Sequence, residues 1–356
     1  MKTSLSLANI KKTDRSDMLS LLLDFPAQCR DALGIALSIR ILFARRDFTK
    51  IAFAGLGGSA IGADLVRSYL YFESKLPISV LREYELPAYV DSSTLVFISS
   101  YSGNTEETLS AYNDARAKGS TIIALSSGGA LKEYAQRDKV TFIEIPRGLP
   151  PRCALGYMSI IPLCALGRLG LIKDPGVAVT RMADTLEGLK GNILNPNAGQ
   201  KENIAKRIAI KLTGKFAVIY AGSVHFDMVA TRFKGQLNEN SKSLASSHTF
   251  PEMNHNEIMG WDHPGKLFKD FLVIFLRDKM MHPRVSARMD ITRDILKKQK
   301  VKVVEIWSCA EDLLSRIFSL IYIGDFISFY LAVLYGIDPT PVERVTYLKN
   351  ELAKRK

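Results

Sequence analysis

The stretch 53-FAGLGGSAIG-62 decides the fold class. It follows the apolar run KIAFA and precedes ADLVRSYLYF, so the order is buried strand, glycine-rich turn, helix. Gly55, Gly57 and Ala60 fit the G-x-G-x-x-G/A spacing with which such a unit brings backbone N–H groups to a phosphate. The turn therefore predicts a phosphate-binding α/β domain. It leaves open whether the phosphate belongs to a dinucleotide or to a smaller metabolite.

Short apolar runs and helical segments alternate along most of the chain. Runs rich in β-branched residues predict strands over residues 50–55, 77–83, 94–100, 120–127 and 139–146, and again over 215–223, 242–250, 271–278 and 300–308. Buried strands that alternate with helices form parallel sheets covered on both faces. We therefore predict an α/β fold of two doubly wound, flavodoxin-like parallel-sheet domains joined by helical segments.

The same pattern gives the predicted domain organisation. Residues 1–48 form an N-terminal helical arm, residues 49–190 the first domain, residues 191–335 the second domain, and residues 336–356 a C-terminal helical tail. The longest apolar stretch, RIFSLIYIGDFISFYLAVLYGI, is interrupted by Gly324 and Asp325. We interpret it as a buried helix and expect no membrane partner.

The composition is that of an ordinary globular protein, with 47% hydrophobic and 24% charged residues in 356. The chain begins with a polar segment unlike a signal peptide, and its four cysteines show no C-x-x-C spacing, which favours reduced thiols and a cytoplasmic location. The formal net charge of +12 is spread along the chain. Because no zinc-finger, RNA-recognition or clear helix-turn-helix pattern accompanies it, we expect no nucleic-acid partner, whereas an anionic metabolite would be attracted.

A second turn, ISSYSGNTEET, follows the third predicted strand and opens a helix. Ser100, Ser102 and Thr105 place three hydroxyl groups beside the free N–H groups of a helix N-terminus, a combination that suits a phosphate dianion. The alternative is that Ser102 and Thr105 only cap the helix. A dinucleotide site needs instead an acidic residue about 20 residues after the glycines, and Glu83 and Glu85 lie late on or past the second strand. Two such turns at the carboxyl edge of one sheet favour a small sugar phosphate.

These turns, GLGGSAIGADL and SSYSGNTEETL, together with LSSGGALKEYA, resemble the three signature loops of the sugar isomerase (SIS) domain. PPRCALGY, QLNENSK, PEMNHNE and VERVTYLK resemble more narrowly the bifunctional phosphoglucose/phosphomannose isomerases, and the resemblance covers nearly the whole chain after the arm. It implies interconversion of glucose 6-phosphate and mannose 6-phosphate with fructose 6-phosphate through an enediolate, without cofactor or metal. It also implies a role in glycolysis and gluconeogenesis, and a homodimer whose active sites are shared between subunits.

The resemblance further implies roles for individual residues. The substrate and its phosphate are bound by Gly57, Gly58, Ser59, Ser100, Ser102 and Thr105. The catalytic residues are Glu239 as the base between C1 and C2, Arg152 facing the enediolate, His255 opening the sugar ring from the partner subunit, and Lys349 beside the ring oxygen. Without the resemblance, Glu239 is interpreted as a surface acid and Lys349 as a lysine on a terminal helix. His248 and His263 are interpreted as structural or solvent-exposed.

One position departs from the family pattern. Val342 stands where a threonine associated with room for both C2 epimers is often found, and Thr340 lies two positions earlier, so the preference between the two aldoses stays open. Two rival functions also stay open, a non-catalytic sugar-phosphate-binding regulator and an aminosugar-phosphate isomerase. A regulator normally carries a DNA-binding domain, and the residues before Ile51 contain no convincing one.

Overall fold

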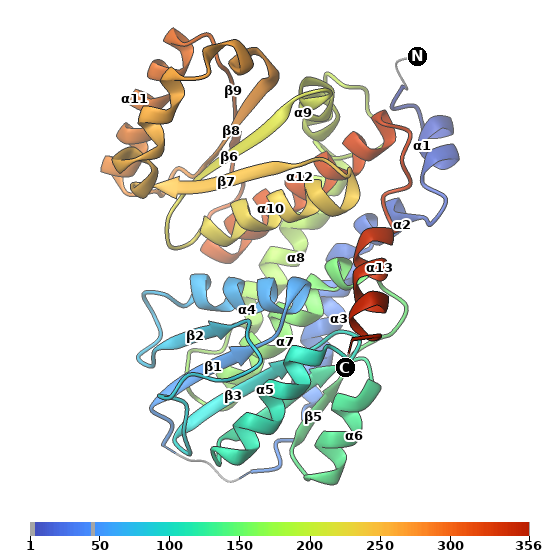
Figure 1. Ribbon diagram of the computed structural model, residues 1–356, viewed down its shortest axis with the longest axis vertical. Helices are drawn as coiled ribbons and strands as arrows, with labels where there is room; N and C mark the ends of the chain where they lie inside the picture. The colour runs from blue at the N-terminus through green and yellow to red at the C-terminus, as the bar shows by residue number, and fades with distance from the viewer. Residues whose placement is uncertain (1–3, 44–46, 356) are drawn as a thin grey trace.

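The computed structural model describes residues 4–43 and 47–355 and contains two parallel β-sheets (Figure 1). In spatial order, the first sheet comprises β2 (Ile78–Leu81), β1 (Lys50–Ala54), β3 (Thr94–Ser99), β4 (Thr121–Ser126) and β5 (Thr141–Glu144). The second comprises β7 (Ala245–Phe250), β6 (Phe216–Gly222), β8 (Phe271–Arg277) and β9 (Lys302–Trp307). Every one of these strands lies within a predicted run, and all neighbours pair in parallel. The predicted fold of two parallel-sheet α/β domains is confirmed.

Both faces of each sheet are buried, which is why the inner strands β1, β3, β4, β6 and β8 are apolar almost without interruption. The edge strand β7, with the sequence ASSHTF, is mostly polar. In β1, Ile51 and Phe53 belong to one hydrophobic cluster, and the alternating Ala52 and Ala54 belong to another on the opposite face. In β6, Ile219 belongs to the same cluster as Phe53. The two sheets therefore turn one face each toward a single common core.

Helices fill the common core and cover the two outer faces. The core contains α3 (Phe25–Ser38), α4 (Gly57–Tyr69), α7 (Leu155–Arg168), α8 (Gly176–Gly191), α9 (Ile204–Leu212), α10 (Asp227–Asn240) and α12 (Leu313–Leu334). The outer face of the first sheet is covered by α5 (Glu106–Ala117) and α6 (Gly129–Arg137). That of the second is covered by α11 (Pro283–Lys298) and the 3-10 turns η2 (Glu252–His255), η3 (Glu257–Asp262) and η4 (Gly265–Asp270).

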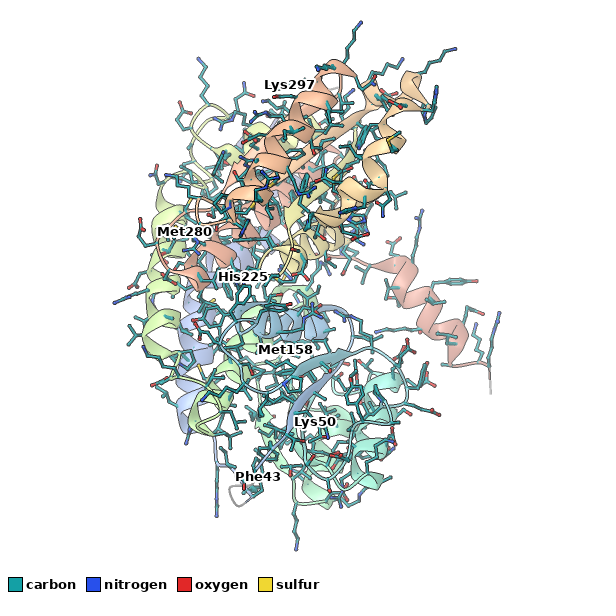
Figure 2. All side chains as sticks on the ribbon, turned by 90° about the vertical axis from the view of Figure 1, so that its left-hand side faces the viewer. Phe43, Lys50, Met158, His225, Met280 and Lys297 are labelled. Atoms are coloured by element: carbon teal, nitrogen blue, oxygen red, sulfur yellow. The ribbon has the colours of Figure 1, made fainter. Side chains whose placement is uncertain are left out.

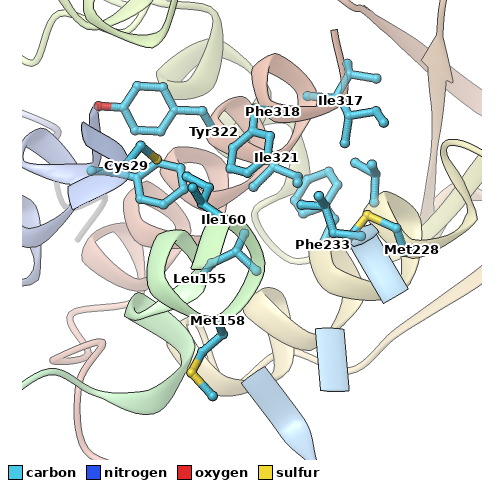
Figure 3. Close-up of a cluster of buried hydrophobic side chains, with 14 of the residues drawn as sticks. Cys29, Leu155, Met158, Ile160, Met228, Phe233, Ile317, Phe318, Ile321 and Tyr322 are labelled. Carbon is cyan, nitrogen blue, oxygen red and sulfur yellow. The ribbon is translucent and has the colours of Figure 1, made fainter. Parts of the chain in front are cut away.

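Figure 3 shows part of the common core, where Leu155 and Ile160 of α7 lie beside Phe318 and Tyr322 of α12 and near Cys29 of α3. By length and composition α12 is apolar enough to cross a membrane, with a mean hydropathy of 2.0, yet 94% of its most apolar window is buried inside the protein. The prediction of a buried helix is confirmed for this segment.

The two ends of the chain differ in how they are held. The N-terminal helices α1 (Leu7–Thr13) and α2 (Met18–Leu23) lead into α3, which packs on α7 and α8. The C-terminal helix α13 (Glu343–Leu352) has no buried residue, and Figure 2 shows it standing out from the rest of the chain. Because α3, α8 and α12 share one core, the predicted boundaries after residues 48, 190 and 335 stay predictions.

Candidate active site

Three helices, α4, α5 and α6, begin at the carboxyl edge of the first sheet. Their first turns leave backbone N–H groups without partners in the helix, and these groups attract anions. The turns before α5 and α6 touch through glycine, since a Cβ atom on Gly103 would lie 1.7 Å from the carbonyl oxygen of Gly128. The turn before α4 is also close to its neighbour, because a Cβ atom on Gly55 would lie 2.6 Å from the carbonyl oxygen of Ser99. The three turns therefore form one continuous surface suited to a phosphate.

The predicted hydroxyl groups of this surface have different surroundings. Ser59 and Ser100 are buried, Thr105 is half-buried and Ser102 is exposed. The Ser100 hydroxyl accepts a hydrogen bond from a backbone N–H three residues later and lies 2.9 Å from the Thr105 hydroxyl. Thr105 immediately precedes α5, yet its side chain makes no capping hydrogen bond, so the cap-only alternative does not describe Thr105. Ser100 organises the turn, and Ser102 presents its hydroxyl at the surface.

Arg152 reaches the same edge from η1 (Pro151–Cys153). A Cβ atom on Gly58 would lie 2.7 Å from the carbonyl oxygen of Pro151, so the lack of a side chain at Gly58 lets the Arg152 segment contact the first turn. Gly57 beside it is exposed and has a φ of +52°, a conformation that favours glycine. Gly58 thus permits a close backbone contact, and Gly57 permits the positive φ of the turn.

The Arg152 guanidinium is almost fully buried, with 5% of its side chain exposed. Its Nε donates to Oδ1 of Asn240 at 2.6 Å, and its Nη2 donates to the carbonyl oxygens of Pro339 and Thr340 at 2.8 and 2.9 Å. Its Nη1 lies 3.5 Å from Oε2 of Glu239. Because Nε and Nη2 are occupied by protein oxygens, Nη1 is the nitrogen that faces the carboxylate.

Glu239 lies in the last turn of α10, and 43% of its side chain is exposed. Its carboxylate is therefore accessible to a ligand while remaining paired with a fixed guanidinium. The structure thus brings together two predicted residues that are separated by 87 positions and come from different predicted domains.

His255 and Lys349 lie away from the Arg152–Glu239 pair. Helix α10 runs from the carboxyl edge of the second sheet to its amino edge, so Glu239 in its last turn lies at the amino edge, whereas His255 follows β7 at the carboxyl edge. A six-residue strand spans about 20 Å, which separates the two residues within one chain. Lys349 is exposed on α13. Within the described residues, neither His255 nor Lys349 forms a hydrogen bond or ion pair with Arg152 or Glu239.

Comparisons with known proteins identify the family. Residues 201–352 match the family model described as the bacterial phospho-glucose isomerase C-terminal SIS domain. A bifunctional phosphoglucose/phosphomannose isomerase from Caldicellulosiruptor bescii is 46% identical over 334 residues, which cover 94% of this chain and 98% of that protein. The chain belongs to the bifunctional phosphoglucose/phosphomannose isomerase family. A second member, from Aquifex aeolicus, is 38% identical over 305 residues, which cover 85% of this chain and 90% of that protein.

The fold agrees with this family assignment. A solved structure of a hypothetical protein from Thermus thermophilus aligns over 94% of this chain and 89% of its own, with a TM-score of 0.72 and 16% identity. At that identity the likeness concerns the fold alone. Among residues 4–43 and 47–355, no group of three or more His, Cys, Asp or Glu side chains is arranged to hold a metal ion.

In this isomerase the residue preceding α13 is Val342, and Thr340 is the nearby threonine that contacts the site. Thr340 contributes its carbonyl oxygen to Arg152, and its hydroxyl is buried without a partner in the described residues. The departure from the family pattern at Val342 therefore lies at the residue before the terminal helix and not at a residue bonded to Arg152.

Two residues of the isomerase site escaped sequence reasoning although they stand in the quoted motif QLNENSK. Asn240 accepts the Arg152 Nε hydrogen bond. Lys242 donates to the carbonyl oxygens of Glu239 at 2.5 Å and of Pro341 at 2.7 Å, which ties α10 to the C-terminal tail. Burial, and to a smaller extent the charge of Arg152, lowers the pKa of Lys242. Their positions, one and three residues after Glu239, were the available signal.

The neighbouring thiol and histidines have no part in these contacts. Burial raises the pKa of the Cys153 thiol to about 11, so it stays protonated at neutral pH. His263 is exposed, and His248 lines a small groove with Asp227 on the β7 edge of the second sheet. Both histidines have the structural or exposed positions expected from the sequence.

Proposed function

We propose that this protein is an aldose–ketose isomerase that interconverts glucose 6-phosphate and mannose 6-phosphate with fructose 6-phosphate. The observation that carries the proposal is the pairing of the Glu239 carboxylate with the buried Arg152 guanidinium at 3.5 Å, directly beside the phosphate-binding turns. The names of relatives that align over nearly the whole chain supply the substrate class.

The phosphate of the substrate would bind at the N-termini of α4, α5 and α6, where backbone N–H groups and the Ser102 hydroxyl converge. Glu239 then removes the proton from C2 of the aldose, and the electron pair of that bond forms the C1–C2 double bond of the enediolate. Arg152 Nη1 faces the developing negative charge, and a buried guanidinium is permanently charged. The electron pair of the C1 carbonyl moves onto O1, which gains a proton while O2 loses one. Return of the carbon-bound proton to C1 then gives the ketose, so neither atoms nor electrons are supplied from outside.

Ring opening requires a second acid/base, and His255 is the proposed group because imidazole exchanges protons near neutral pH. Its position at the opposite edge of the sheet from Glu239 supports the proposal of a homodimer in which His255 acts in the partner's site. Lys349 on the unpacked helix α13 is proposed to act beside the ring oxygen. We also propose a cytoplasmic enzyme of glycolysis and gluconeogenesis, with no nucleic-acid or membrane partner.

The direct test is a coupled assay that starts from fructose 6-phosphate and measures glucose and mannose 6-phosphates separately. We expect both products, and in deuterated water we expect deuterium at C2 of each aldose, because an enediolate exchanges its proton with solvent. Formation of neither aldose would contradict the proposed function. Formation of glucose 6-phosphate alone would contradict its mannose part.

The role of Glu239 is tested by Glu239→Gln, which keeps the shape and removes the base. We expect kcat to fall by at least about 100-fold while fructose 6-phosphate still binds. The matched control is Glu187→Gln on α8, because the Glu187 side chain is 48% exposed and is also paired with a cation, Lys190. Equal activity of the two variants would contradict the assignment of the base.

A further inference from the structure

A hydrogen-bonded network of buried polar side chains connects Arg152 with the protein interior. On α10, Arg232, Gln236 and Asn240 are four residues apart and so share one face of the helix. They bond to Asp325 and Ser328 on α12. All five side chains belong to residues that are at most 5% exposed. Burying so many polar groups is unfavourable unless each is hydrogen-bonded.

The direction of each hydrogen bond through Asn240 is fixed by chemistry. Arg152 only donates, so the Asn240 atom at 2.6 Å from its Nε must be the carbonyl oxygen. The Asn240 Nδ2 therefore faces the Ser328 hydroxyl at 3.0 Å and donates to it, and that hydroxyl donates in turn to the carbonyl oxygen of Asp325 at 2.7 Å. A carboxamide both accepts from Arg152 and donates to α12, and neither a carboxylate nor an apolar side chain does both.

A second branch of the same network holds the backbone of Arg152. Arg232 Nη2 donates to Oδ2 of Asp325 at 2.7 Å and to the carbonyl oxygen of Arg152 at 3.1 Å. Gln236 donates to the other Asp325 oxygen at 3.0 Å. The side chain and the main chain of Arg152 are thus both connected to the middle of α12.

The N-terminal arm closes this network on its other side. Met18, Leu21, Leu22 and Phe25 line a small cavity together with the polar residues of α10 and α12. The Gln28 side chain donates to the carbonyl oxygen of Cys153 and accepts from the N–H of Gly156, both at 2.8 Å. The arm therefore covers the polar network with apolar groups and clamps the chain directly after Arg152.

We propose that Asn240 is a positioning residue for Arg152, supported from behind by Ser328 and by the Arg232–Asp325 pair. The inference rests on the proposed function, because the task of Arg152 is to face the enediolate. Asn240 touches no reacting atom. It fixes the rotation of the guanidinium so that Nη1 points toward Glu239, and a misplacement of about 1 Å at such a group costs up to about 100-fold in rate.

The test is a double-mutant cycle on kcat with fructose 6-phosphate as substrate. We expect Asn240→Ala to lower kcat about 10- to 100-fold with KM changed by less than about twofold, because the phosphate turns are untouched. In an Arg152→Ala background, the same change should lower kcat no further. A residue that only stabilises the fold would lower kcat equally in both backgrounds, and that result would overturn the proposal.

Ser241→Ala is the matched control, since Ser241 is equally buried beside Asn240 and its hydroxyl donates only to the carbonyl oxygen of Leu237 in α10. It should leave kcat unchanged in both backgrounds. If Asn240→Ala does not fold, Ser328→Ala removes only the support behind Asn240 and should lower kcat several-fold when Arg152 is present and not when it is absent. An unchanged kcat in folded Asn240→Ala or Ser328→Ala would also overturn the proposal. Failure of the proposed function is distinguishable, because the unaltered enzyme would then form no aldose phosphate.

Discussion

Gly103 and Gly119 have nearly the same backbone conformation, with φ of +71° and +69°, but they differ in their surroundings. A Cβ atom on Gly119 would meet only Ser92, at an ordinary 3.7 Å, whereas a Cβ atom on Gly103 would lie 1.7 Å from the carbonyl oxygen of Gly128. Replacing each glycine by alanine in a separate variant therefore distinguishes the cost of the backbone conformation from the cost of pushing apart the two turns of the proposed phosphate site.

The two costs are estimated separately. An alanine in the left-handed conformation costs about 1–2 kcal/mol, and this is all we expect for Gly119→Ala. In Gly103→Ala the two turns must also separate by about 1.3 Å to reach even the 3.0 Å below which real Cβ contacts essentially never occur, which adds about 1–3 kcal/mol of overpacking. The free energy of unfolding should therefore fall by about 2–5 kcal/mol in Gly103→Ala.

Function should separate the two variants further. The displaced turns carry the proposed phosphate site, so kcat/KM for fructose 6-phosphate should fall about 100-fold in Gly103→Ala and stay unchanged in Gly119→Ala. Urea denaturation and steady-state kinetics on the two folded variants measure both effects. Equal stability and equal kcat/KM in the two variants would refute the contact between the turns.

Three further outcomes are expected. The double variant Ser102→Ala/Thr105→Ala should raise KM for fructose 6-phosphate more than about tenfold with little change in kcat, because it removes hydroxyl groups from the phosphate surface; an unchanged KM would exclude that surface. Mixing inactive Glu239→Gln and His255→Ala chains should restore activity in hybrid dimers, and hybrids that form yet stay inactive would contradict the shared site. Alkylation of the native Cys153 thiol, followed by mass spectrometry, should be very slow at pH 8. Its rate should rise about tenfold per pH unit toward pH 11, because only the thiolate reacts. A rate equal to that of the urea-unfolded chain would show that the thiol is not held protonated.

The strands and the turns that follow β1 and β3 were predictable because their signals are local. Most strands are short apolar runs bounded by turn residues, and the glycines of the first turn lie within ten residues of the strand they follow. The rule that parallel strands gather their carboxyl ends at one edge then places two separate turns together without any structure.

The surroundings of Arg152 could not be predicted in this way. Its guanidinium bonds to Asn240, 88 positions later, and to the carbonyl oxygens of Pro339 and Thr340, 187 and 188 positions later. Backbone carbonyls carry no residue-specific signal, so no motif announces them. The hydrogen bonds of Gln28 to the chain after Arg152 were equally unpredictable, because a single glutamine in an N-terminal helix gives no indication of its partner. Asp325 gives a partial signal, because a charge inside a strongly apolar helix requires a buried partner. The sequence does not say which residue that is, and the structure identifies it as Arg232.

The position of Asp325 near the middle of α12 has a consequence for the chain before it folds. In length and hydropathy, this segment resembles a transmembrane helix that a translocation channel would insert into the lipid bilayer. On insertion scales an aspartate at the centre of a helix opposes that transfer by about 2.5–3.5 kcal/mol, whereas each leucine or isoleucine favours it by only a few tenths. The carboxylate that anchors Arg232 in the folded protein thus also disfavours lipid insertion of the newly made segment, until α10 supplies the partner that lets it be buried in protein instead.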